Sequence, residues 1–345
     1  MTKRLFRDGG PHNVKSLGND QYQMSISIPK DSDGRVAREC ANSLCSPAYF
    51  KVTPGTGIAG GQDVIYCPYC KREAGPSDFT TQEQIRYAKD VALREAQGGI
   101  DDMIKDAFGL EPSGTKKMGG GFISIEMTYK PGTPRQVVRP YEDEVRRDVV
   151  CPHCALDQTV FGLAAWCSDC GRDIFLIHVS AEIAVIQSML KDVRRREQDL
   201  GKRVAAKDLE NCLEDAVSIF EASVKALVRR ALAERGDAPM SIDSQMKKVG
   251  NSFQSTERSK EQLFELFNYS PSQPDLWERL SGSFEKRHPV THNLGVVDRK
   301  YLERAQQAER EGREVRISES EVAVLLEDIF SAISEIHHAL VGAEA

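Results

Sequence analysis

The spacing of apolar residues divides the chain into two halves. From about residue 181 onward, apolar residues recur every three or four positions, which is the period of a helix that buries one face. One such stripe runs over 209–227 and another over 318–341, and shorter helices are expected over 256–268, after Pro274 and from Asp298. Amphipathic helices joined by short loops predict an all-α bundle over 181–345.

The first half has a different pattern, in which apolar residues alternate with polar ones or form short runs. This pattern indicates strands, which are expected over 21–29, 64–67, 122–129, 136–142, 161–166 and 173–179. A helix over 80–108 is expected to begin at a cap of Thr80 or Thr81 and to be interrupted at Gly98 and Gly99. The stretch 110–121, which contains several glycines, reads as a flexible linker.

Eight of the nine cysteines fall into four close pairs. Cys151 with Cys154 and Cys167 with Cys170 are two C-x2-C knuckles twelve residues apart. Thiolates are ligands that Zn²⁺ prefers, and four of them satisfy its tetrahedral coordination. Gly171, directly after the second knuckle, permits a tight turn. The sequence therefore predicts one structural zinc here.

A second four-cysteine site is predicted from the wider pair Cys40 and Cys45 together with the knuckle Cys67 and Cys70. A redox C-x2-C would need a βαβ context, which the pattern lacks. Coordination crossed between the two sites remains open at this stage. With all eight thiolates used as ligands, neither Zn²⁺ keeps an open position for a catalytic water. Cys212, on the apolar face of a helix, is expected to be a buried thiol.

The cysteine modules resemble zinc ribbons, which combine knuckles with strands. The expected fold class is therefore a multidomain α+β protein, in which two small β-rich zinc ribbons precede an all-α helical bundle. The expected domains are a zinc-ribbon module with a helical extension over 1–110, a second zinc-ribbon module over 111–180 and the bundle over 181–345.

Charge and hydropathy exclude some classes of protein. The chain has 46 Lys and Arg against 52 Asp and Glu, a formal net charge of −6, so it is no polycation, and nucleic-acid affinity must come from a local patch. No stretch approaches the length of a membrane span, and the N-terminal residues lack an apolar segment, so no membrane partner and a cytoplasmic location are expected.

In the helical half, Arg287 and His292 are separated by four residues within the segment EKRHPVTHNLGVVD, residues 285–298. This arrangement resembles the R-x(4–6)-H motif of the HEPN superfamily, in which the residue after the arginine is often polar, as His288 is here. The resemblance covers roughly 181–345. It implies a metal-independent endoribonuclease that acts as a homodimer through its bundle, with Arg287 and His292 as catalytic residues and RNA as the partner. His288 and Asn293 are secondary candidates, and bacterial defence or toxin systems are the implied context.

The residue types suit this chemistry. A histidine can move a proton near neutral pH, so His292 could act on the ribose 2′-hydroxyl during its attack on the adjacent phosphate. The planar, permanently charged guanidinium of Arg287 could stabilise the charge that develops on that phosphate. On an ideal helix, however, five positions rotate by about 500°, which leaves the two side chains about 140° apart. The two side chains can converge only if the helix is broken or distorted between them. Pro289 permits such a break, and it could also be the first residue of a new helix.

A non-catalytic alternative is retained. In it the chain is a zinc-ribbon protein that binds nucleic acid or acts as an adaptor, with a dimerising bundle and a regulatory protein as a possible partner. Arg194, Arg195 and Arg196 are expected to be a solvated charged face, with phosphate contact as the alternative. His337 and His338 are expected to be exposed on the last helix.

Overall fold

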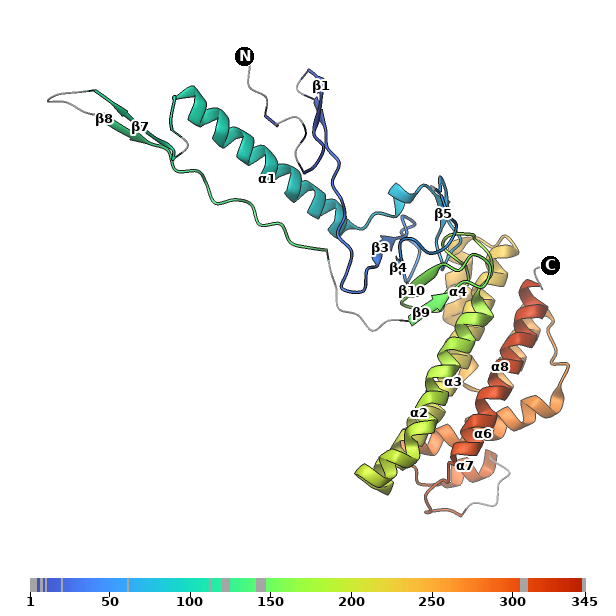
Figure 1. Ribbon diagram of the computed structural model, residues 1–345. Coiled ribbons are helices and arrows are strands. Elements are labelled where there is room, and N and C mark those ends of the chain that lie inside the picture. Colours follow the sequence, from blue (N-terminus) through green and yellow to red (C-terminus); the bar gives the residue numbers. More distant parts are fainter. Residues whose placement is uncertain are drawn as a thin grey trace.

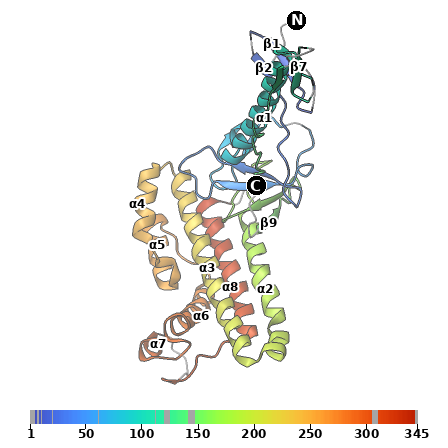
Figure 2. The ribbon, with the colours of Figure 1, turned by 90° about the vertical axis from the view of Figure 1, so that its left-hand side faces the viewer.

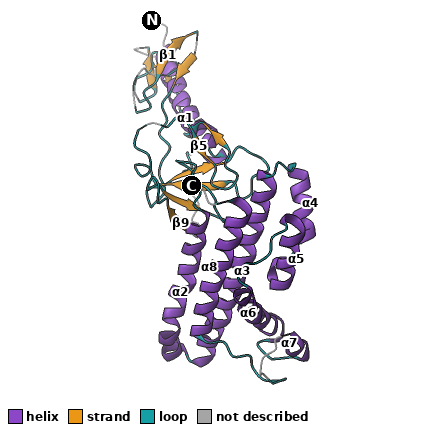
Figure 3. Ribbon diagram, turned by 90° about the vertical axis from the view of Figure 1, so that its right-hand side faces the viewer, coloured by secondary structure: helices purple, strands orange, loops and turns teal. Residues whose placement is uncertain are grey.

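The computed structural model describes residues 5–6, 9, 11–19, 21–60, 62–111, 113–119, 125–140, 147–304 and 310–342. The chain is a mixed α+β protein. Figure 1 shows three parts, namely an elongated arm built on the helix labelled α1, a small central sheet and a bundle of long helices. Figure 3 shows that strands are confined to the arm and the central region, while the bundle is helical.

The central sheet has four antiparallel strands in the order β3-β4-β10-β9. Strands β3 (Val36–Glu39) and β4 (Tyr49–Val52) come from the first cysteine segment, and β9 (Arg147–Val150) and β10 (Asp157–Val160) come from the second. The register pairs Gln158 with Val52 and Val160 with Phe50. The expectation of two separate ribbon modules divided at 110/111 therefore differs from the structure, because β4 and β10 join both segments into one sheet.

The structure contains some of the expected strands and lacks others within the described residues. The strand expected over 64–67 is β5 (Ile65–Tyr66), which pairs with β6 (Glu73–Ala74) around the knuckle. Residues 161–166, which were expected to form a strand, form a loop. The strand predicted over 173–179 is wrong, because α2 begins at Phe175. The N–H of Phe175 donates to the carboxylate of Asp173 at this helix start. Residues 136–140 form no strand, and the rest of that expected strand lies outside the described residues.

The arm is inserted between the two cysteine segments. A short 3-10 helix, η1 (Pro76–Phe79), leads into α1 (Gln82–Ala107), which starts at a capping box formed by Thr81 and Gln84. The helix runs through the two glycines where an interruption was expected. Beside it lie two hairpins, β1 (Lys15–Gly18) with β2 (Gln21–Gln23) and β7 (Thr115–Met118) with β8 (Ile125–Thr128). Strand β7 thus occupies part of the expected linker, and β2 covers only the start of the strand expected over 21–29.

The bundle is formed by α2 (Phe175–Leu200), α3 (Lys202–Glu234), α6 (Pro274–Asn293) and α8 (Glu319–Val341). Three shorter helices, α4 (Pro239–Val249), α5 (Thr256–Phe267) and α7 (Arg299–Arg304), and the 3-10 helix η2 (Ser252–Gln254) complete it. Figure 2 shows α4 and α5 beside α3, with α6 and α7 toward the end of the bundle far from the sheet.

The bundle core follows the predicted stripes. Apolar side chains such as Leu213, Phe220 and Leu227 from α3 and Ile329 from α8 are fully buried. Cys212 is among them, as expected for a structural thiol. Because burying each such side chain contributes roughly 1.5–3 kcal/mol, this one continuous core dominates the stability of the helical half. No helix in the described ranges is both long enough and apolar enough to cross a membrane.

Candidate metal centres and the Arg287 and His292 region

The first candidate metal centre is formed by Cys40, Cys45, Cys67 and Cys70, whose sulfur atoms lie within 4.8 Å of one another. The Sγ atoms of Cys40 and Cys70 are 3.7 Å apart, as are those of Cys45 and Cys67. These distances are far beyond a disulfide bond of about 2.05 Å. Ligand sulfurs bound tetrahedrally to zinc at about 2.3 Å lie roughly 3.8 Å apart, so the group has the dimensions of a four-cysteine metal site.

The second centre is formed by Cys151, Cys154, Cys167 and Cys170 with the same dimensions. The Sγ distances are 3.7 Å between Cys151 and Cys170 and 3.5 Å between Cys154 and Cys167. Each group therefore takes its four ligands from one segment of the chain, and the crossed arrangement left open above does not occur. His153 lies between two ligands without joining them, and its ring contacts the guanidinium of Arg172 at 3.2 Å.

Three of the turns that bring the sulfurs together share one backbone feature. The residue after the second cysteine of each knuckle has positive φ, at 58° for Lys71, 60° for Ala155 and 65° for Gly171. In each case its N–H donates to the carbonyl of the first cysteine at 2.9–3.0 Å. Gly171 adopts this conformation without a steric cost, as the sequence predicted. Its ideal Cβ would also lie 3.0 Å from the Tyr66 ring, so that ring packs directly on the knuckle.

The two centres are joined by backbone hydrogen bonds. The carbonyl of Pro68, inside the first knuckle, accepts from the N–H groups of Ala165 and Trp166 at 2.9 and 3.1 Å. The N–H of Tyr66 donates to the carbonyl of Ser168, inside the second knuckle, at 2.9 Å. The ring of Trp166 lies between two cations, with Lys71 Nζ 3.7 Å and Arg230 Cζ 4.0 Å from its centre. The knuckles and the bundle helix that carries Arg230 therefore meet at this tryptophan.

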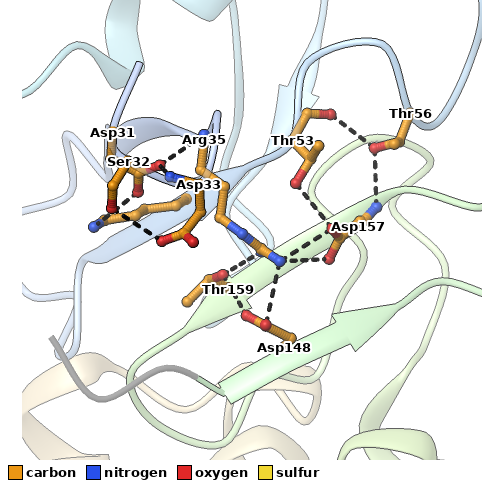
Figure 4. A network of polar contacts seen from close by, with 10 residues as sticks. Asp31, Ser32, Asp33, Arg35, Thr53, Thr56, Asp148, Asp157 and Thr159 are labelled. Carbon is orange, nitrogen blue, oxygen red and sulfur yellow. Dashed lines mark hydrogen bonds and ion pairs between the residues drawn. The ribbon is translucent and has the colours of Figure 1, made fainter. Parts of the chain in front are cut away.

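A second connection between the cysteine segments is a partly buried polar network around Arg35, drawn in Figure 4. The Arg35 guanidinium donates to both carboxylate oxygens of Asp157 at 3.0 and 3.1 Å and lies 3.2 Å from Asp148. It also donates to the hydroxyl of Thr159. Arg35 precedes β3, whereas its three partners lie on β9 and β10. Nothing in the sequence indicates this network, because a single arginine after a turn has the same local pattern as any surface arginine.

Arg287 and His292 lie on α6, which continues without a break from Pro274 to Asn293. The break that Pro289 would permit does not occur, because the proline lies inside this helix. The helix ends one turn after the proline, where the Pro289 carbonyl accepts from Gly295 N at 2.9 Å. Packing explains this, because Phe284 and Val290 on the same helix are buried in the core and hold it helical through the proline. Arg287 and His292 thus keep the separation of about 140° that an ideal helix gives them.

The polar surroundings of the two residues differ. Within the described residues Arg287 forms no ion pair, and its Nε atom is buried without a hydrogen-bond partner. His292 is exposed, and its ring lies 5.1 Å from the ring of His288, centre to centre. Asp298 lies 3.8 Å from His288 Nε2 and accepts a hydrogen bond from Asn293 at 2.7 Å. Hydrogen bonds from the Tyr301 backbone and from Asn293 lower the pKa of Asp298, so this carboxylate stays ionised beside His288.

Two further groups from the sequence analysis are now placed. Arg194, Arg195 and Arg196 pair with Glu319, with Asp192 and Asp199, and with Asp208 respectively, as a solvated and neutralised face would. The prediction that His337 is exposed is wrong, because this residue is only 6% exposed and its Nε2 lies 3.2 Å from Asp173. Its ring stacks on Phe175 at 5.7 Å, whereas His338 is exposed.

The chain was compared with protein-family models, with curated proteins and with solved structures. None of the three comparisons found a match. The description of the fold and of the two four-cysteine groups therefore depends only on the sequence and structure of this chain.

Proposed function

We propose that this protein is a metal-independent endoribonuclease of HEPN type, held together by two structural zinc ions. The observation that carries the proposal is the charge of Arg287, which meets no carboxylate within the described part of the chain. Its neighbour Lys286, by contrast, is neutralised by Glu321. An arginine without an ion pair, on the same helix as an exposed histidine, is available to a phosphate group.

The imidazoles supply the proton chemistry in this proposal. His292 is open to solvent and removes a proton from the ribose 2′-hydroxyl or returns one to the leaving 5′-oxygen. His288 lies beside it, oriented by the ionised Asp298, and is the second group placed to move a proton. The expected products are a 2′,3′-cyclic phosphate and a 5′-hydroxyl. DNA lacks the 2′-hydroxyl and is spared.

The unbroken α6 supports a dimeric site. Since one continuous helix directs Arg287 and His292 to different sides, a single chain is poorly arranged to aim both at one phosphate. Two chains packed through this end of the bundle could combine Arg287 of one subunit with His292 of the other. The homodimer expected from the sequence thus becomes a requirement of the proposed mechanism.

The proposed role of zinc is structural. Eight thiolates in two closed four-cysteine groups leave no coordination position for a substrate. Thiolates are soft ligands and favour zinc over magnesium or calcium. The ions would hold the knuckles and, through the shared sheet, the end of α2 that enters the bundle. Their binding free energy would be folding free energy of this module.

The test is cleavage of a single-stranded RNA in EDTA added only to the assay, with the zinc-loaded protein. Arg287→Ala and His292→Ala should each reduce the cleavage rate by at least about a hundredfold. His338→Ala and Arg195→Ala serve as matched controls, because both residues are exposed and neither lies on α6. Mixing the two inactive variants should restore part of the activity if each dimer site uses one residue from each chain.

Full activity of His292→Ala would overturn the proposed mechanism. RNA binding by wild-type protein without any turnover would favour the alternative, in which the chain is a zinc-containing binding or adaptor protein. The fact that favours this alternative is that α6 does not bring Arg287 and His292 together within one chain.

A further inference from the structure

His288 and His292 lie one turn apart on the same face of α6. They are four positions apart, so their side chains leave the helix within about 40° of each other. Their ring centres are 5.1 Å apart and their ring planes differ by 56°. Both rings can be reached from solvent, because the side chain of His288 is 25% exposed and His292 is exposed.

The separation of the two rings is the one that a shared metal ion produces. A nitrogen ligand lies about 2.1 Å from zinc, which puts the centre of its ring roughly 3.2 Å from the ion. In tetrahedral coordination, two such rings have their centres roughly 5.2 Å apart. The 5.1 Å between the rings of His288 and His292 matches this value. The pair can thus supply two metal ligands without any change in the continuous backbone of α6.

Asp298, which directly precedes α7, supplies a third ligand. Its carboxylate lies 3.8 Å from Nε2 of His288, close to the roughly 3.4 Å between two ligand atoms of a tetrahedral zinc site. Asn293 donates to Oδ2 of this carboxylate at 2.7 Å, and the N–H of Tyr301 donates to Oδ1 at 2.7 Å. Such hydrogen bonds hold a metal-ligating carboxylate in one orientation. Two imidazoles and one carboxylate are a donor set that suits zinc and other divalent transition metals.

We propose that His288, His292 and Asp298 bind a divalent transition-metal ion and that this ion inhibits the proposed ribonuclease. The metal site stands on the geometry of the three residues, whereas the inhibition rests on the proposed function. A metal bound to an imidazole occupies the lone pair that would accept a proton from the ribose 2′-hydroxyl. With the ion in place, neither His288 nor His292 can move that proton.

The ion should exchange readily. Within the described residues, only the two four-cysteine groups have three or more ligand atoms that already lie within 4.8 Å of one another. The exposed His292 side chain must therefore turn, and the Asp298 carboxylate must approach His288 slightly, when the ion binds. This ordering costs free energy, so binding is weaker than in the cysteine centres. Figure 2 shows α6 and α7 at the end of the bundle far from the sheet, so gel filtration should remove this ion without disturbing those centres.

Cobalt tests the site in the full-length protein with zinc in both cysteine centres. After gel filtration, titration with Co²⁺ should add one ion per chain, seen by its visible absorption. Cobalt that replaced zinc in a cysteine centre would show an additional thiolate charge-transfer band in the near ultraviolet. His292→Ala and Asp298→Asn should each weaken cobalt binding at least about tenfold, although asparagine keeps the acceptor for the Tyr301 N–H. Arg287→Ala and His338→Ala are the matched controls and should leave cobalt binding unchanged.

Cleavage of single-stranded RNA in the absence of a chelator tests the inhibition. Zn²⁺ at about ten times its Kd should lower the rate of the wild-type protein about tenfold, as occupancy of the site requires, and EDTA in the assay should restore it. In Asp298→Asn the same Zn²⁺ concentration should lower the rate about twofold or less, relative to that variant without zinc.

Binding and inhibition can fail separately. Unchanged cobalt binding in His292→Ala and Asp298→Asn, or no further cobalt ion in the wild type, would overturn the metal site whatever the protein does to RNA. Cobalt binding that depends on both residues, in a protein that cleaves no RNA, would support the site and overturn the inhibition together with the ribonuclease. A wild-type cleavage rate that zinc leaves unchanged or raises would overturn the inhibition alone.

Discussion

The imidazole of His337 lies 3.2 Å from the carboxylate of Asp173, so the last helix of the bundle is joined to the third residue after Cys170. Asp173 also pairs with Arg230 on α3, and the N–H of Phe175 donates to its Oδ1 at 2.8 Å. One carboxylate therefore connects the second metal centre, the start of α2, and the helices α3 and α8. We expect it to couple the stability of the cysteine module to that of the bundle.

Asp173→Asn should lower the free energy of unfolding by about 1–2 kcal/mol at neutral pH, a figure reduced for partial solvent screening. Burial alone would raise the pKa of Asp173, but hydrogen bonds from His337 and Arg230 lower it to about 2. A carboxyl group whose pKa is lower in the folded state than in the unfolded state stabilises the fold at pH values above its unfolded pKa, which is near 4. This stabilisation is lost as the pH falls toward the folded pKa. The difference between wild type and variant, from urea unfolding, should thus be constant between pH 5 and 7 and shrink below about pH 4. A difference that grows on acidification would contradict this.

When zinc is supplied in excess and exchangeable metal is then removed by gel filtration, Cys154→Ser should hold one ion per chain instead of two. The matched control is Cys212→Ser, because Cys212 is buried in the bundle core and belongs to neither four-cysteine group. This control should keep both ions while losing some core packing. Metal analysis by mass spectrometry gives the stoichiometry. If Cys154→Ser still holds two ions per chain, the assignment of the second group is wrong.

Removal of one metal should also weaken the other centre. Pro68, Ala165 and Trp166 connect the knuckles through backbone hydrogen bonds, and β4 pairs directly with β10. Titration with a chelator should therefore release both ions in one cooperative step in wild type. Two independent release steps, followed with a colorimetric zinc indicator, would show that the centres do not share stability.

Arg35→Ala should destabilise the sheet strongly. Removing the guanidinium leaves Asp157 and Asp148 without their cation in a partly buried network, which typically costs about 3–5 kcal/mol for a buried pair and less here, because Asp148 is 43% exposed. Arg94→Ala, a substitution of an exposed arginine, is the control and should change the melting temperature little. If thermal denaturation gives the two variants the same melting temperature, the prediction is wrong.

Pro289→Ala should stabilise the protein by about 1 kcal/mol or more. The proline lies inside an unbroken helix, where it removes a backbone donor and crowds the preceding turn. Alanine restores the donor, although it gives up some buried apolar surface of the ring. Thermal denaturation measures the change. A large destabilisation would mean that the proline itself shapes this end of α6.

The sequence determined the parts of the molecule that depend on local pattern. The stripes of Leu213, Phe220 and Ile329 predicted helices because a period of three to four residues buries one helical face. The spacing of Cys151, Cys154, Cys167 and Cys170 predicted a four-cysteine group because two C-x2-C turns supply four sulfurs at once. These predictions needed no knowledge of what packs against them.

Tertiary structure alone decided the rest. Pairing of β4 with β10 joins residues more than a hundred positions apart, such as Val52 and Gln158, and no local pattern encodes which strands meet. Packing around Phe284 and Val290 kept α6 helical through Pro289, overriding the local preference of the proline. His337 became buried because Asp173, distant in sequence, supplies the partner that an interior histidine requires. Local pattern fixes what each segment becomes, whereas long-range pairing fixes which polar groups find partners, and that depends on the whole fold.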